Sequence, residues 1–132
     1  MNRRAFFFAS VLTGLAVPVL VSTSRAAGPI RMIFVSGQDC SYCRMWRNKY
    51  EESWRASPEF QHVTWTEIEP AHLREAYQAR YWPADLHDIL DQVPRKNGTP
   101  RFLIVKDGEI VSNELGTNKW GVTLNRLRKL LD

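Results

Sequence analysis

The chain has 132 residues, of which 44% are hydrophobic and 24% are charged, and its formal net charge is +4. This length suits one compact domain and is short for two. Removing Arg3, Arg4 and Arg25 from the 18 basic residues leaves 15 against 14 acidic residues, and the two signs are interspersed. Such a balance excludes the basic surface that binds nucleic acid or anionic lipid, so neither is predicted as a partner.

The first 26 residues have the layout of an export signal. Two arginines precede an apolar run over residues 5–21, and small residues at Ser24 and Ala26 fit cleavage after Ala26. A membrane anchor is the alternative, but the run has 17 residues, including Gly14 and Pro18, whereas a spanning helix needs about 20. We therefore expect residues 1–26 to be a signal peptide and residues 27–132 to be one domain without a membrane span.

The arginine pair at the start leaves the export route open. Arg3-Arg4 followed by Phe6 and Phe7 is similar to a twin-arginine signal, but paired arginines also occur in general secretory signals. Either route leads to an oxidising compartment, which permits disulfides.

The first part of the domain predicts a strand and a helix. Residues 30–36 form a β-branched and apolar run before Gly37, which is typical of a buried strand. A helix over residues 40–57 should follow and end before a proline, because apolar residues recur there at helical spacing, namely Cys43, Trp46, Tyr50 and Trp54.

The middle of the domain predicts a second strand and a broken helix. Residues 62–68 form a weak strand with Val63, Trp65 and Glu67 on one side. Residues 71–93 should be helical with a break near Trp82-Pro83, and the second half has apolar residues at helical spacing, namely Leu86, Ile89, Leu90 and Val93.

The last part predicts a hairpin and a terminal helix. Residues 102–105 and 109–114 are strands joined by the Asp107-Gly108 turn. An amphipathic helix then follows, with apolar positions at Trp120, Leu124, Leu127, Leu130 and Leu131. The order β-α-β-α-β-β-α predicts an α/β fold, in which a mixed sheet of about four strands has helices on both faces.

Cys40 and Cys43 are the only cysteines and form a C-x-x-C motif with Ser41 and Tyr42. Cys40 falls at the start of the first helix, where exposed N–H groups and the macrodipole favour a thiolate, the attacking species in disulfide exchange. The negative charge of Asp39 disfavours a Cys40 thiolate, whereas the positive charge of Arg44 favours one. We expect the Cys40 sulfur to lie open to a partner, with Cys43 one turn below it.

Three other uses of the cysteines are weaker. A structural staple closing four residues contributes roughly 2 kcal/mol, whereas a loop of about a hundred residues would give well over 4. Zinc needs two more ligands, and His62, His72 and His87 show no ligand spacing. Haem attachment needs a histidine where Arg44 stands. A redox pair is therefore preferred, with no metal and no cofactor beyond its own disulfide.

Large aromatic residues recur through the chain. Trp46, Tyr50, Trp54 and Trp65 are predicted to lie in the core. Trp82 and Trp120 either pack beneath a helix, which is favoured, or edge a substrate groove.

Over residues 29–131 the chain resembles the thioredoxin-like superfamily in its minimal form. The resemblance rests on a strand, a C-x-x-C at a helix start, and Thr99-Pro100 leading into a hairpin and a final helix. The segments "CSYCRMW" and "GTPRFLIVKDGEIV", together with the export signal, are similar to small periplasmic thiol:disulfide oxidoreductases, including those associated with sulfur oxidation.

The resemblance implies roles for individual residues. Cys40 would form a mixed disulfide with a partner and Cys43 would resolve it. Pro100 would be a cis-proline, and Thr99 would offer backbone hydrogen bonds to a bound polypeptide.

The chain also departs from the family pattern. Asp39 stands where an aromatic residue is usual, and Phe34 replaces a buried acid. Ser41-Tyr42 replaces the Gly-Pro dipeptide between the two cysteines and should shift the reduction potential of the pair.

We therefore expect a monomeric periplasmic oxidoreductase that reduces disulfides on exported proteins and receives electrons from a membrane thiol-transfer protein. A disulfide donor or isomerase is one alternative. A non-catalytic binding or metal-binding module is the other.

Overall fold

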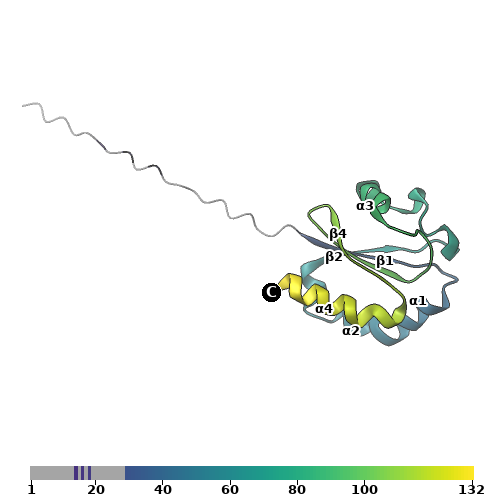
Figure 1. The fold of residues 1–132 in the computed structure, drawn as a ribbon. Helices are drawn as coiled ribbons and strands as arrows, with labels where there is room; N and C mark the ends of the chain where they lie inside the picture. Colours follow the sequence, from purple (N-terminus) through teal and green to yellow (C-terminus); the bar gives the residue numbers. More distant parts are fainter. Residues whose placement is uncertain (1–13, 15, 17, 19–28) are drawn as a thin grey trace, which may run out of the picture.

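The computed structural model describes residues 14, 16, 18 and 29–132 (Figure 1). The predicted signal peptide, residues 1–26, lies outside the described residues apart from those three positions. Within the described part of the chain, no helix combines the length and the hydropathy needed to cross a membrane.

Four strands form one mixed sheet: β1 (Ile30–Val35), β2 (Val63–Ile68), β3 (Arg101–Lys106) and β4 (Glu109–Leu115). Their order is β2-β1-β3-β4, in which β1 and β2 are parallel and the other pairs are antiparallel. β1 is almost wholly buried in the centre, as its apolar run predicts. The sheet confirms the predicted strands, and the loop that carries the cysteines begins where β1 ends.

Helices cover both faces of the sheet (Figure 1). One face carries the active-site helix, formed by α1 (Ser41–Trp46), a π-helical turn (Arg47–Glu51) and α2 (Glu52–Arg55), together with α4 (Trp120–Leu131). The other carries α3 (His87–Gln92). The predicted arrangement is confirmed, although the first helix is interrupted by a π-helical turn.

Aromatic rings fill the core between the sheet and the active-site helix. Trp46 packs on Phe34 with ring centroids 4.5 Å apart and meets Trp120 edge-on at 5.2 Å. Trp54 meets Trp120 at 5.1 Å. A buried tryptophan removes roughly 150–250 Å² from water, or about 4–6 kcal/mol as an upper bound at about 25 cal/mol per Å². Trp46 and Trp54 therefore anchor the helix that carries Cys43.

The two tryptophans for which the sequence left two alternatives are both core residues. Trp82 and Trp120 are each 3% exposed, on opposite faces of the sheet. Neither edges a groove, and the packing alternative is confirmed.

The prediction of a helix from residue 71 is wrong for its first half. Residues 73–75, 79–81 and 84–86 are separate 3₁₀ turns, and only His87–Gln92 is α-helical. His72 and Gln78 have extended backbones that interrupt the segment. One contact from elsewhere in the fold and one within the segment replace helical ones, since the Leu73 N–H donates to Asp39 and the Trp82 indole donates to the Ala76 carbonyl.

Candidate active site

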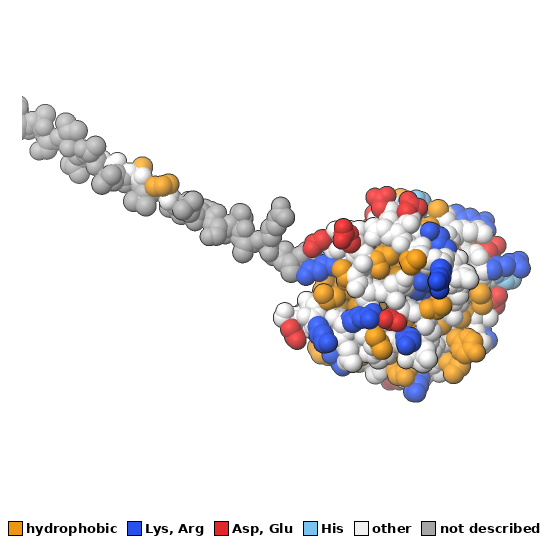
Figure 2. All heavy atoms as spheres, in the orientation of Figure 1, with side chains coloured by type: hydrophobic (Ala, Val, Ile, Leu, Met, Phe, Trp, Pro, Cys, Tyr) orange, Lys and Arg blue, Asp and Glu red, His pale blue; other side chains and the backbone are white. Residues whose placement is uncertain are grey.

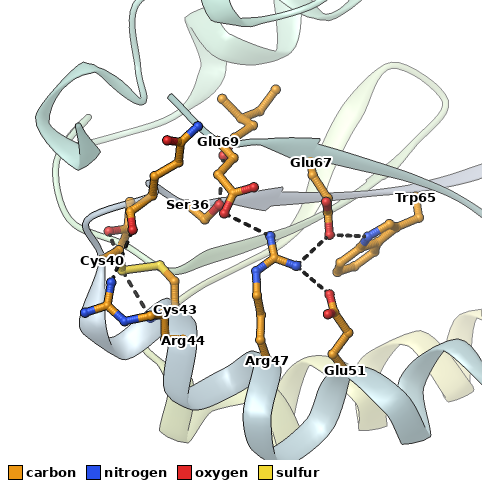
Figure 3. A network of polar contacts seen from close by, with 12 residues as sticks. Ser36, Cys40, Cys43, Arg44, Arg47, Glu51, Trp65, Glu67 and Glu69 are labelled. Atoms are coloured by element: carbon orange, nitrogen blue, oxygen red, sulfur yellow. Dashed lines mark hydrogen bonds and ion pairs between the residues drawn. A yellow bond between two sulfur atoms is a disulfide. The ribbon is translucent and has the colours of Figure 1, made fainter. Parts of the chain in front are cut away.

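The two cysteines form a disulfide at the start of the active-site helix (Figure 3). Cys40 has an extended backbone and is the N-cap of α1, while Cys43 is buried in its first turn. Their Cα atoms lie 5.2 Å apart. The predicted placement of the pair on the helix is confirmed.

Two hydrogen-bond donors converge on the Cys40 sulfur. The Cys43 backbone N–H and the Thr99 hydroxyl each lie 3.1 Å from Cys40 Sγ. Among residues 29–132, no donor is found on Cys43 Sγ. Hydrogen bonds to the charged form of a group favour that form, so reduction of the disulfide would leave Cys40 as the better stabilised thiolate.

Thr99 reaches the disulfide from the loop before β3. The Thr99-Pro100 peptide bond is cis, as the resemblance implies. The Pro100 carbonyl accepts a hydrogen bond from Gly116 N–H at 2.8 Å. In residues 29–132 the backbone N–H and C=O of Thr99 have no hydrogen-bond partner, so both remain available to a bound chain.

The expectation that the Cys40 sulfur lies open is wrong for this disulfide form. Cys40 and Cys43 are each 1% exposed. The Thr99 side chain lies against Cys40 Sγ, and both cysteines belong to the core cluster that includes Met32 and Phe34. A partner sulfur therefore cannot reach Cys40 Sγ in this form without a local movement of the residues around it.

A groove of about 920 Å³ begins beside the covered sulfur. Thr99 lines the groove and also contacts the sulfur, while Tyr42 and Met45 are 63% and 55% exposed along it. Figure 2 shows hydrophobic side chains gathered at the lower right, over the region of α1 in Figure 1. The groove's other lining residues are Asn48, Lys49, Tyr50, Gly116, Thr117 and Asn118.

Asp39 holds the preceding loop against a distant segment. Its Oδ1 accepts the Leu73 N–H at 2.7 Å, and its Oδ2 lies 3.5 Å from Nδ1 of His72. The Leu73 N–H is the main reason that the pKa of Asp39 is lowered below 3.8. Asp39 therefore takes part in a tertiary contact that the sequence did not predict.

Replacing Asp39 with Asn should lower stability at neutral pH and have no effect in acid. Because the folded pKa is depressed, the carboxylate contributes stability above 3.8, and that contribution is lost as the pH falls through the lower folded value. Urea midpoints of both proteins at pH 7 and below pH 3 measure the difference. Equal midpoints at pH 7 would show that the carboxylate contributes nothing.

Arginines on the active-site helix bind backbone and carboxylates. Arg44 donates to the Gln38 carbonyl at 3.2 Å, in the loop before Cys40 (Figure 3). Arg47 pairs with Glu51 of its own helix, with Glu67 of β2 and with Glu69 after β2. Burial opposes the charge of Arg47, but these pairs outweigh burial and raise its pKa. Arg47 thus ties the helix to β2.

No group of three or more His, Cys, Asp or Glu side chains in the described residues is placed to hold a metal ion. His72 pairs with Asp39, and His87 Nε2 lies 3.0 Å from the Ala79 carbonyl.

The fold has counterparts among solved structures, although no family model and no curated protein matches the chain. The periplasmic thioredoxin SoxS from Paracoccus pantotrophus, in its reduced form, is 15% identical, with a TM-score of 0.56 over 78% of this chain and 99% of that one. Thioredoxin F from spinach chloroplast is 16% identical, with a TM-score of 0.54 over 80% of both chains. Fasciola hepatica thioredoxin is 20% identical, with a TM-score of 0.50 over 77% of this chain and 82% of that one. The chain therefore has the thioredoxin-like fold, with a C-x-x-C disulfide at the start of its first helix.

Proposed function

We propose that the protein is an exported thiol–disulfide oxidoreductase that acts in the periplasm on disulfides of other exported proteins. The observation that carries the proposal is the convergence of the Cys43 N–H and the Thr99 hydroxyl on Cys40 Sγ at a helix N-terminus. This arrangement favours one sulfur of the pair as thiolate, which is what directional exchange requires.

The reaction is a two-electron exchange between the dithiol and a partner disulfide. The Cys40 thiolate attacks one partner sulfur, the partner's S–S bond breaks, and the departing thiolate takes up a proton. Cys43 then loses its proton and attacks Cys40 Sγ, which releases the second partner thiol. The partner gains two electrons and two protons, and the protein is left with the Cys40–Cys43 disulfide seen here.

Regeneration needs an external source of two electrons and two protons. We propose a membrane thiol-transfer protein for this role, with no cofactor other than the cysteine pair. The +1 charge of residues 27–132 supports neither nucleic acid nor lipid as a partner, and the protein is proposed to act as a monomer.

The partner segment is proposed to lie in the groove beside the disulfide. Tyr42 and Met45 offer exposed apolar surface there, and Thr99 offers its unpaired backbone groups. A local movement of the residues around Cys40 then opens its sulfur to the partner, while the Thr99 hydroxyl can still donate to it.

Reduction of insulin disulfides by the purified protein, with dithiothreitol as electron source, tests the assignment. The expected result is turnover well above the rate with dithiothreitol alone. An inactive protein that retains two free thiols and stoichiometric bound metal would instead support the metal-binding alternative.

The redox equilibrium of the cysteine pair with glutathione gives its reduction potential, which indicates the direction of exchange. The two donors on Cys40 Sγ stabilise the reduced form, and stabilising the reduced form raises the reduction potential. A potential near −120 mV would make the protein a disulfide donor, whereas one near −270 mV would make it a reductase.

A further inference from the structure

Arg101 is a buried arginine whose hydrogen-bond acceptors are all neutral groups. It is the first residue of β3, directly follows Pro100, and is 4% exposed. Its guanidinium lies over the Tyr77 ring, 5.3 Å from the centroid. Within residues 29–132 no carboxylate pairs with it, although a buried charge is costly unless its donors are satisfied.

All three guanidinium nitrogens donate hydrogen bonds to oxygen acceptors. Nε donates to the Tyr77 hydroxyl at 2.8 Å, and Nη1 donates to Asn113 Oδ1 at 2.8 Å. Nη2 donates to the carbonyls of Arg95 and Asn97 at 2.8 and 3.1 Å. The side chain thus joins β3 to β4, to Tyr77 and to the loop before Thr99.

Arg101 and Tyr77 together hold that loop. The Tyr77 hydroxyl donates to the Gly98 carbonyl at 2.6 Å, and burial raises the pKa of Tyr77, which keeps the hydroxyl protonated. Arg95 and Gly98 have positive φ values of 48° and 86°, and the loop has no regular secondary structure. One backbone bond, from the Asn97 N–H to the Arg95 carbonyl at 2.6 Å, lies within the loop, and the remaining support comes from side chains. The residue that follows the loop is Thr99.

Arg101 acts from the face of the sheet opposite the disulfide. Along β3, Phe102 packs in the core cluster that contains the cysteines, whereas Leu103 packs in the other cluster. Successive residues of a strand alternate between faces, so Arg101 lies on the side of Leu103. Any influence on Cys40 must pass through the loop and Thr99.

We propose that Arg101 is a positioning residue for disulfide exchange, which holds residues 95–98 so that the Thr99 hydroxyl stays on Cys40 Sγ and the Thr99 backbone faces the groove. The proposal rests on the proposed function. It assigns the buried charge a role in setting the redox equilibrium of the cysteine pair.

The test is the redox equilibrium of the full-length protein with glutathione, measured for Arg101→Met, Thr99→Val and the double variant. A hydrogen bond to a charged group contributes about 1.5–3 kcal/mol. We expect each single variant to favour the disulfide form by about tenfold, which corresponds to a potential about 30 mV lower. The double variant should match Thr99→Val, because both changes remove the same contact.

Matched controls separate positioning from general damage. Tyr77→Phe removes the bond to Gly98 and should shift the equilibrium in the same direction. Asn113→Ala removes a contact of Arg101 outside the loop, and Arg31→Met removes an arginine paired with Asp85 elsewhere on the sheet. Both should leave the equilibrium within about twofold of wild type. If Arg101→Met does not fold, Arg101→Lys, which retains the charge and loses the fork of donors, should show a smaller shift of the same sign.

The outcomes are distinguishable. An Arg101→Met protein that is less stable in urea but keeps the wild-type equilibrium would overturn the proposal and leave the oxidoreductase assignment in place. A wild-type protein that does not exchange with glutathione would overturn the proposed function itself. Additive shifts in the double variant would show that Arg101 acts by a route other than Thr99.

Discussion

Cys43→Ser is expected to accumulate as a stable mixed disulfide with its substrate, linked through Cys40. The Cys40 sulfur accepts both hydrogen bonds and is proposed to attack first, but the proposed resolving thiol, one turn below it, is missing in this variant. The covalent complex should include most of the protein when the substrate disulfide is in excess. Non-reducing gel electrophoresis followed by mass spectrometry of the linked peptide measures it.

Cys40→Ser is the matched control, since it retains one cysteine in the same helical turn. It should form no such complex and should reduce insulin no faster than dithiothreitol alone. Cys43 is buried and has no donor on its sulfur within the described residues. If both variants formed the complex equally, the roles assigned to the two cysteines would be wrong. If Cys40→Ser retained full activity, the mechanism would be ruled out.

Gly37→Ala is expected to destabilise the fold strongly, although it adds only one methyl group. A Cβ at position 37 would lie 2.6 Å from Leu73 Cα and 2.7 Å from Leu73 N, so the backbone itself would have to move. Overpacking of this kind typically costs about 1–3 kcal/mol. The displaced backbone also carries the Leu73 N–H that binds Asp39. Thermal unfolding should show a Tm lower by roughly 5–20 °C.

Gly121→Ala is the control, because it adds the same methyl group without an expected loss of stability. Gly121 lies in α4, and a Cβ there would meet nothing within 4 Å. Alanine is the better helix former by up to about 1 kcal/mol, so this variant should be as stable as wild type or more so. A Gly37→Ala protein with wild-type stability would show that the cysteine loop and residue 73 are not packed this closely in solution.

The sequence predicts those parts of the fold whose signals are local. The apolar run of β1, the Asp107-Gly108 turn and the spacing of Cys43, Trp46 and Trp54 each identify an element within a few residues. The position of Cys40 at a helix start follows from the same local pattern.

Contacts made across the fold could not be predicted in this way. The Thr99 hydroxyl covers Cys40 from 59 positions away, so exposure of the sulfur could not be read from its neighbours. The sequence predicts a helix over residues 71–82, but hydrogen bonds to Asp39 and within the segment hold these residues in separate turns. Arg101 gave one signal, a charged residue directly before the apolar run of residues 102–105.

The wide separation of Cys40 and Thr99 has a consequence for biosynthesis. A ribosome makes both cysteines long before it makes β3, whose pairing with β1 brings the Thr99 loop onto the sulfur. Contacts between distant segments form late because the intervening chain must first close. Burial of the cysteines therefore requires the pairing of β3 with β1, and we expect both sulfurs to be open to solvent in a polypeptide whose C-terminal half has not yet docked.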